Sequence, residues 1–278
     1  MVRRLADLHL HTNASDGILS VSDLVKKVAG RGIKIFSITD HDNFDALDEA
    51  DKLAQEYNLT SIPGIELGIS FEGKEVHILA YFFDRTNEEL LSLLKYLKSE
   101  REHRAIKIIQ KLSAKGFKIG IEEVLIQANG APIVRPHIAQ VLYKKGYVKN
   151  PNAAYHLYLA NHASCYEPKI FISPNIVFDT ISKSGGISSI AHCGNLPDNL
   201  VMNMIESGLD AIEIQHPSHS TEQVNFLRKL TESYFLLVTG GSDYHGDRPA
   251  DESNLGKYFV YEAEVDAIKQ RLQKRKLA

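Results

Sequence analysis

Apolar positions along the chain follow two periods, and segments of the two kinds alternate. The short apolar run at residues 33–39 is typical of a buried parallel strand, whereas residues 21–29, with Ser20 as the expected N-cap, have the spacing of a helix. Such alternation predicts an α/β fold with a mainly parallel sheet or a barrel. Further strands are predicted over residues 3–11, 61–71, 75–83, 186–191, 211–215, 235–239 and 257–261, and further helices over residues 44–57, 198–206 and 220–231 and from residue 264.

One stretch departs from this alternation because it is helical throughout. A long helix is predicted over residues 88–115, ending at Gly116, and shorter helices follow over residues 122–128, 136–144 and 152–159. We therefore expect a distorted, TIM-like barrel formed by residues 1–98 and 166–278, with a small helical domain inserted at residues 99–165.

Charge separates the same two parts of the chain. Residues 95–149 carry 12 lysines and arginines and four glutamates, a net charge of +8, whereas the whole chain carries −3, so the remainder carries −11. A basic insertion attracts polyanions. Within the long helix, Arg104, Lys107, Lys111 and Lys115 form one stripe, which is either a solvated face or, if it overlooks the site, a track for a nucleic-acid backbone.

Composition excludes several classes of protein. Apolar residues make up 44% of the chain and charged residues 24%, as in ordinary globular proteins, and no apolar run is long enough to span a membrane. The N-terminal residues show no secretory signal, and two cysteines, Cys165 and Cys193, cannot build a disulfide framework. We therefore expect a cytoplasmic protein with no membrane contact, and no obligate protein partner is evident.

Histidines and carboxylates gather where the predicted strands end. His9 and His11 lie two residues apart on one strand, so their rings share a face and can converge on one ion, and Asp16 follows in a loop that can return to them. His41 and His245 each follow a strand beside aspartates. For His9 and His11, the competing interpretation is a pair of hydrogen-bonded histidines in a polar pocket. For the segment around His41, it is a turn formed by Asp and Asn.

Other side chains extend this set. Glu66 on an otherwise apolar strand is costly unless it is paired or bound to metal, whereas His77 alone would be interpreted as a core histidine. We interpret Cys193 as a small buried residue rather than a soft ligand. The nine nitrogen and oxygen ligands, enough for two or three divalent ions such as Mn, Zn or Fe, are His9, His11, Asp16, His41, Glu66, His77, His192, Asp243 and His245.

These motifs resemble those of the PHP (polymerase and histidinol phosphatase) superfamily of metal-dependent phosphoesterases. The matching segments extend from residue 7 to residue 245: Asp-Leu-His-Leu-His-Thr from Asp7, Ser15-Asp16-Gly17, Thr39-Asp40-His41-Asp42, Gly64-Ile65-Glu66, the strand of His77, Ala191-His192 and Ser242-Asp243-Tyr244-His245. Within the superfamily, Arg135-Pro136-His137-Ile138-Ala139 and Glu213-Ile214-Gln215-His216-Pro217 look most like the branch of nucleotide 3′-phosphatases and 5′→3′ exoribonucleases. Two departures from that branch are Cys193, where proline is usual, and the segment Asn161-His162-Ala163-Ser164.

The resemblance implies a (β/α)7 barrel and three metal ions. By the family pattern, Glu66 bridges the first and second ions. The first ion would bind His9, His11, Glu66 and Asp243, the second Glu66, His77 and His192, and the third Asp16, His41 and His245.

Three residues are candidates for holding the substrate. Arg135 is a bidentate donor for phosphate, and Pro136 suits the first turn of a helix, whose N–H groups near His137 would point at an anion; the competing interpretation pairs Arg135 with a core carboxylate. His216 would hold phosphate or protonate the leaving oxygen, unless it is a solvated rim histidine. The expected catalytic residues are Glu66, Arg135 and His216.

The expected activity is hydrolysis of nucleotide phosphate esters by a metal-bridging hydroxide. The substrates would be 3′,5′-bisphosphonucleotides, which lose the 3′-phosphate, and short RNA, which is hydrolysed from its 5′ end. Two alternatives stay open: a phosphatase or amide hydrolase for a small metabolite, and a non-catalytic metal-binding domain. The intact set of nine ligands counts against the second alternative.

Overall fold

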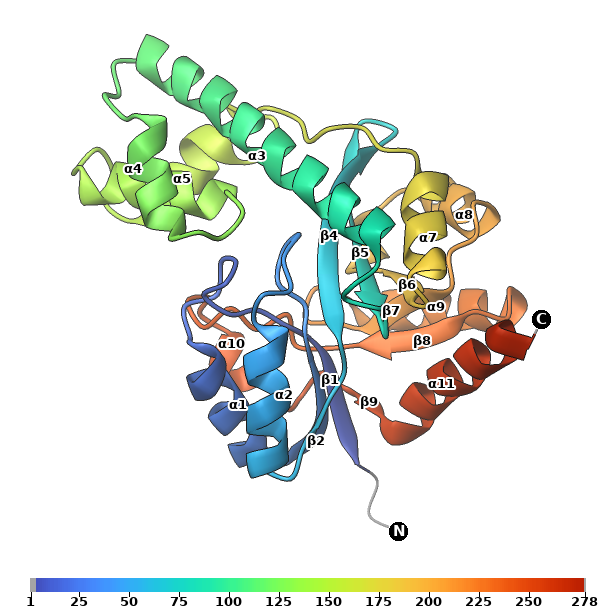
Figure 1. Ribbon diagram of the computed structural model, residues 1–278. Helices are drawn as coiled ribbons and strands as arrows, with labels where there is room; N and C mark the ends of the chain where they lie inside the picture. The colour runs from blue at the N-terminus through green and yellow to red at the C-terminus, as the bar shows by residue number, and fades with distance from the viewer. Residues whose placement is uncertain (1–3, 278) are drawn as a thin grey trace.

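The computed structural model describes residues 4–277, which form two β-sheets, flanking helices and a helical lobe (Figure 1). The first sheet has the order β3-β2-β1-β9. Its strands are β1 (Leu5–Leu10), β2 (Ile33–Ile38), β3 (Thr60–Ser61) and β9 (Val260–Tyr261), and only β9 runs antiparallel to its neighbour. Arg3, where the first strand was predicted to begin, lies outside the described residues.

The second sheet has the order β4-β5-β6-β7-β8 and mixes both strand directions. Its strands are β4 (Gly64–Phe71), β5 (Lys74–Tyr81), β6 (Ile187–Ile190), β7 (Ala211–Gln215) and β8 (Leu237–Gly240). The predicted hairpin between β4 and β5 is confirmed, and β6, β7 and β8 are parallel, as expected. Two isolated parallel bridges, Leu10–Tyr244 and His41–Glu66, link the sheets, but no continuous ladder closes residues 4–277 into one sheet.

Helices cover the sheets along buried apolar faces. In α1 (Val21–Gly30), the Ser20 hydroxyl accepts a hydrogen bond from the Asp23 backbone N–H, so Ser20 is the N-cap that the sequence predicts. The others are α2 (Leu47–Glu56), α7 (Pro174–Lys183), α8 (Asp198–Glu206), α9 (Thr221–Ser233), α10 (Asp251–Asn254), α11 (Glu262–Leu277) and a 3₁₀ turn, η2 (Cys193–Asn195). None of the helices in residues 4–277 combines the length and apolar character that a membrane span requires.

The helical lobe has an apolar core of its own. It contains the second half of α3 (Glu88–Ala114), α4 (Ile121–Ala128), α5 (Arg135–Lys144), α6 (Pro151–Ala154) and a π-helix, η1 (Tyr155–Leu159). The first half of α3 packs on the main core through Leu90, Leu94 and Leu97, whereas Ile108 and Leu112 belong to the core of the lobe. Figure 1 shows the lobe at the upper left, facing the loops that follow β1 and β2.

Candidate metal centre

All nine predicted ligands converge on one buried region. They come from β1, β4 and β5 and from the loops that follow β1, β2, β6 and β8, so the two sheets contribute jointly. Glu66 lies at its centre, because both of its carboxylate oxygens face histidine nitrogens. Glu66 Oε2 lies 3.4 Å from His9 Nε2, 3.3 Å from His11 Nε2 and 3.1 Å from His41 Nδ1, while Oε1 lies 2.7 Å from His77 Nδ1 and 3.2 Å from His192 Nε2.

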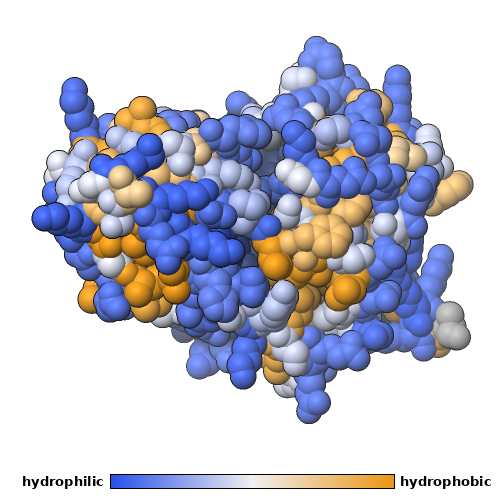
Figure 2. Space-filling view, turned by 90° about the horizontal axis from the view of Figure 1, so that it is seen from above, coloured by the Kyte–Doolittle hydropathy of each residue, from blue (hydrophilic) through white to orange (hydrophobic). Residues whose placement is uncertain are grey.

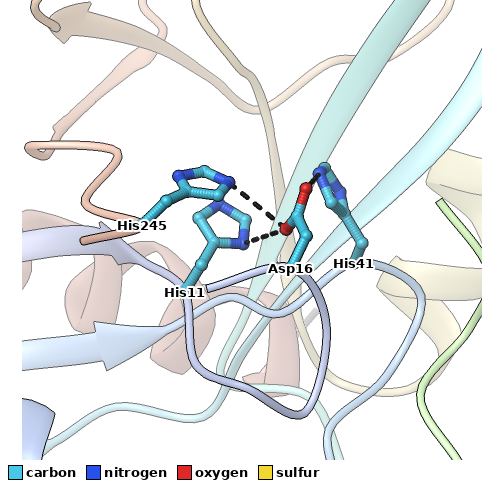
Figure 3. Close-up of side chains that lie close together, drawn as sticks. All are labelled: His11, Asp16, His41 and His245. Atoms are coloured by element: carbon cyan, nitrogen blue, oxygen red, sulfur yellow. Dashed lines mark ion pairs between the residues drawn. The ribbon is translucent and has the colours of Figure 1, made fainter. Parts of the chain in front are cut away.

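A second group surrounds Asp16, which the loop after β1 brings back toward the strand ends (Figure 3). Its carboxylate lies 3.2 Å from His245 Nε2 and 3.8 Å from both His11 Nδ1 and His41 Nε2. The predicted third set, Asp16, His41 and His245, is therefore together, and His11 joins it.

Asp243 completes the arrangement from the loop that follows β8, in the second sheet. One of its oxygens lies 3.4 Å from His9 Nε2 and 3.2 Å from His11 Nε2, so Asp243 shares these histidines with Glu66. Arg248 donates to the other oxygen at 2.6 Å and to His245 Nε2 at 2.9 Å. No sequence motif pointed to Arg248, which lies in a loop and is recognisable only by these contacts.

The electrostatics suit divalent cations. Burial raises the pKa of Glu66, but the neighbouring His41 and His77 outweigh burial and hold that pKa well below its usual range. Burial and the nearby Lys169 lower the pKa of His77 to about 4, and burial also lowers the pKa of His41. At neutral pH the centre therefore offers an ionised Glu66 carboxylate beside neutral rings at His41 and His77, which are the protonation states that metal ligands require. At His9 and His11 burial lowers the pKa, but the neighbouring carboxylates outweigh it and raise that pKa, so an ion bound there would displace a proton.

The orphaned nitrogens of the cluster fit the same donor set. Within residues 4–277, His9 Nε2, His41 Nδ1 and both ring nitrogens of His11 are buried without a hydrogen-bond partner. The candidate ligands form groups of three or four residues that share members. Within each group, the ligand atoms all lie within 4.8 Å of one another. Cys193 packs in the apolar core, and burial raises the pKa of its thiol to about 12, which agrees with its interpretation as a small buried residue.

Glu213 hydrogen-bonds to two histidines of the centre, a role that the sequence analysis did not assign to it. It is fully buried on β7, and its carboxylate accepts from His9 Nδ1 at 2.9 Å and from the His192 backbone N–H at 2.8 Å. A proton fixed on Nδ1 leaves the His9 Nε2 lone pair facing the cluster. The signal that singled out Glu66, a carboxylate on an apolar strand, is present at Glu213 as well.

His216 reaches the edge of the same cluster. Its Nε2 lies 3.5 Å from Asp243 Oδ2, and its Nδ1 accepts the backbone N–H of Ser218 at 3.1 Å. The Ser218 hydroxyl also lies 2.8 Å from Nδ1. His216 Nε2 is buried without a hydrogen-bond partner in residues 4–277, and it forms with His9 and Asp243 a group whose ligand atoms all lie within 4.8 Å of one another. His216 Nε2 therefore faces the centre.

Arg135 and His137, which were predicted to hold the substrate, both form hydrogen bonds to other groups of the protein. Arg135 donates to the Leu159 carbonyl at 2.9 Å, to Asn161 Oδ1 at 2.8 Å and to Glu75 Oε2 at 2.7 Å. Asn161 belongs to the segment that departs from the family branch.

The His137 ring ties α5 to the loop that carries Asp16. Its Nδ1 accepts the Val134 N–H at 3.3 Å, and its Nε2 donates to the Ser15 carbonyl at 3.0 Å. The His137 backbone N–H donates to the Val134 carbonyl at 3.0 Å. These contacts do not support the phosphate-binding role predicted for His137.

An open cavity of about 440 Å³ adjoins the cluster beneath the helical lobe. Its lining includes the candidate ligands Asp16, His41, His77 and His245 together with Arg101, Arg104, Arg135, Tyr155 and Lys169. Glu75 joins two of these arginines, since Oε1 accepts from Arg104 at 2.6 Å and Oε2 from Arg135. Burial raises the pKa of Glu75, but Lys169 and the two arginines outweigh it and lower that pKa to about 2.

Comparisons with known proteins agree with this chemistry. The family model described as PHP domain matches residues 7–163. A 5′-3′ exoribonuclease of Haemophilus influenzae is 31% identical over 90% of this chain and 93% of its own length. A phosphoribosyl 1,2-cyclic phosphate 1,2-diphosphodiesterase of Eggerthella lenta is 28% identical over 87% of this chain and 94% of its own, and a 3′,5′-nucleoside bisphosphate phosphatase of Chromobacterium violaceum is 26% identical over 86% of each chain.

A solved structure has the same fold. The crystal structure of a candidate metal-dependent phosphoesterase from Bifidobacterium adolescentis superimposes with a TM-score of 0.87, is 31% identical, and covers 96% of each chain. A family match over more than half of the sequence and a relative 31% identical across 90% of it show that this chain belongs to the PHP domain family and is a metal-dependent phosphoesterase.

Proposed function

We propose that this phosphoesterase removes the 3′-phosphate from 3′,5′-bisphosphonucleotides and hydrolyses short RNA from its 5′ end. The observation that carries the proposal is a cavity whose lining combines candidate metal ligands, cationic side chains and the ring of Tyr155. A substrate that carries a reacting phosphate, a second phosphate and a base matches these three surfaces. The named activities of the Haemophilus influenzae and Chromobacterium violaceum relatives support the proposal.

We further propose that the nine residues hold two or three divalent ions, Mn, Zn or Fe. Glu66 would bridge two of them, because its two oxygens face different histidines. Bound ions would lower the pKa of water and polarise the phosphoryl oxygens, so that hydrolysis needs no protein nucleophile.

The side chains of the protein then position the substrate. Arg135 keeps its Nε–H and one Nη2–H for a phosphate oxygen after its three protein contacts. His216 would reach a phosphoryl oxygen beside Asp243 through its Nε2. His137 would act only by positioning the loop of Asp16.

A phosphoribosyl cyclic phosphate is a second candidate substrate. The Eggerthella lenta relative favours it, and a cavity of about 440 Å³ falls within the range of small-molecule sites. The two candidates differ in the base, which only the nucleotide would place against Tyr155.

The test is a comparison of kcat/KM for three substrates with Mn²⁺-reconstituted protein: 3′,5′-bisphosphoadenosine, a short 5′-phosphorylated RNA and phosphoribosyl 1,2-cyclic phosphate. We expect the first two to be hydrolysed most efficiently. A clear preference for the cyclic phosphate would replace this proposal by the second candidate.

We also interpret the two sheets as parts of a distorted (β/α)7 barrel, supported by the bridges Leu10–Tyr244 and His41–Glu66. The separate apolar core of the lobe supports an inserted domain at residues 99–165. The cytoplasmic location stays a prediction that rests on the sequence.

A further inference from the structure

We propose that Arg101 and Lys169 form the anchor for the non-reacting phosphate of the substrate, a site separate from Arg135. This inference rests on the proposed function, because it assigns a place to the second phosphate of the same nucleotide. Neither residue belongs to a motif of the sequence. Arg101 lies in the middle of α3, and Lys169 lies in the segment that returns from the lobe to α7.

Arg101 carries a buried donor without an acceptor. Its side chain is 9% exposed, its Nε donates to Asp42 Oδ2, and its Nη1 lies 3.5 Å from the Ile133 carbonyl. Among the residues that the structure describes, its Nη2 has no hydrogen-bond partner, although Arg101 lines the cavity. A buried guanidinium nitrogen left without an acceptor is costly, and an anion in the cavity would remove that cost.

Lys169 is a second cation that lines the cavity. Its Nζ lies 2.7 Å from His77 Nε2, and no carboxylate in residues 4–277 is within ion-pairing distance of it. Nearby acidic groups are already engaged: Asp42 pairs with Arg101, and Glu75 pairs with Arg104 and Arg135. Four cations, Arg101, Arg104, Arg135 and Lys169, therefore share the two carboxylates Asp42 and Glu75, and a net positive charge remains for an anion.

The backbone of β4 brings these two cations together. A β-carbon at Gly68 would lie within 3.0 Å of both Lys169 Nζ and Arg101 Nη2, so the absence of a side chain there makes room for both. Two like charges packed side by side repel each other unless an anion lies between or beside them. A phosphate dianion supplies that charge and accepts from both donors.

The position of the pair suits a second phosphate of one nucleotide. Arg101 and Lys169 line the same cavity as His41 and His77, and Lys169 contacts His77 directly. Figure 2, seen from above, shows hydrophilic surface where the lobe meets the rest of the molecule. A phosphate held there lies beside the candidate metal centre, whereas Arg135 already has three protein acceptors and borders the site.

The experiment compares two substrates that differ only in the anchored phosphate. For the wild type, Lys169→Met and Arg101→Lys, kcat/KM is measured on 3′,5′-bisphosphoadenosine and on adenosine 3′-monophosphate, with Mn²⁺-reconstituted protein of verified metal content. Arg101→Lys keeps a cation for Asp42 but removes Nη2. The control is Lys98→Met, one turn earlier on α3, where Lys98 is exposed and donates to the Gly130 carbonyl.

We expect both variants to lose about 10- to 100-fold on the bisphosphate, the size of one charge-assisted hydrogen bond, and less than about threefold on the 3′-monophosphate. Lys98→Met should match the wild type. Equal losses on both substrates would mean that Lys169 acts through His77 and would overturn the proposal, as would the absence of any loss.

A binding measurement separates this inference from the proposed function. If the wild type hydrolyses neither nucleotide, the proposed function fails, and calorimetric binding of adenosine 5′-monophosphate decides on the anchor. Binding that weakens at least tenfold in Lys169→Met and in Arg101→Lys supports the anchor. Unchanged binding in both variants refutes it.

Discussion

Replacing Glu213 by glutamine should weaken metal binding without touching any proposed ligand. The carboxylate of Glu213 accepts two hydrogen bonds, from His9 Nδ1 at 2.9 Å and from the His192 backbone N–H at 2.8 Å. An amide has one oxygen, so Glu213→Gln turns an N–H₂ group toward one of these donors and loses that hydrogen bond inside a fully buried site.

The expected loss follows from these contacts. One buried, charge-assisted hydrogen bond is worth about 1.5–3 kcal/mol, and removing a partner of a metal-binding histidine typically reduces metal affinity by about 10- to 100-fold. Where the N–H₂ group faces His9, the ring loses the acceptor that fixes the proton on Nδ1. We therefore predict a Mn²⁺ affinity about 10- to 100-fold lower, with most of kcat restored at saturating Mn²⁺.

The assay is a Mn²⁺ titration of metal-free protein against a chelator of known affinity, read together with phosphate release at each Mn²⁺ concentration. Glu232→Gln is the matched control, because Glu232 is an exposed carboxylate on α9. A Glu213→Gln protein with unchanged Mn²⁺ affinity would refute the argument that Glu213 orients His9.

Four other changes test separate parts of the account. Glu66→Gln should lower both metal content and turnover, because a neutral amide bridges ions poorly; elemental analysis with undiminished occupancy and full activity would contradict the shared role of Glu66. Arg135→Ala should reduce kcat/KM by about 10- to 100-fold on 3′,5′-bisphosphoadenosine and on adenosine 3′-monophosphate alike, because Arg135 lies apart from the proposed anchor of the non-reacting phosphate; a loss confined to the bisphosphate would place Arg135 in that anchor. Asp40→Ala should lower the free energy of unfolding, measured in urea, by about 3 kcal/mol. The Asp40 carboxylate accepts hydrogen bonds from the Thr12 N–H at 2.8 Å, the Thr12 hydroxyl at 2.6 Å and the Ser15 hydroxyl at 2.5 Å. A loss below about 1 kcal/mol would contradict this prediction. Cys193→Ala should leave the metal content unchanged, since the thiol packs in the core; lost metal would make Cys193 a ligand.

Local patterns in the sequence predicted the elements that build the centre. The two-residue spacing of His9 and His11 implies a shared strand face, and Glu66 is conspicuous as a carboxylate among apolar neighbours. These inferences need only one strand at a time, and the structure brings the residues together as expected. The hairpin between β4 and β5 was predictable for the same reason, because its turn and both strands are contiguous.

Interactions between distant segments were not predictable in this way. Arg101 and Lys169 are separated by most of the helical lobe, and their proximity depends on how α3 and the returning segment pass Gly68. The division into two sheets likewise depends on hydrogen bonds at the strand edges, which side-chain periodicity does not specify.

Tertiary contacts also changed some local expectations. His137 was expected to face an anion at a helix N-terminus, but its backbone N–H donates to the Val134 carbonyl, and its ring contacts the Val134 N–H and the Ser15 carbonyl. The helix predicted over residues 152–159 continues past α6 as a π-helix, η1. The helix predicted from residue 44 begins at Leu47, because Asn43 donates to the Ala14 carbonyl and caps the preceding turn by accepting from the Asp45 N–H.

Removal and return of the metal tests directly whether phosphate release by this protein depends on bound ions. Phosphate release from 3′,5′-bisphosphoadenosine is measured, together with metal content, in the protein as purified, after exhaustive chelation and after Mn²⁺ is restored. We predict that activity disappears with the bound ions and returns with them, with at least two ions per chain in the active sample. Undiminished release by protein freed of metal would contradict the account.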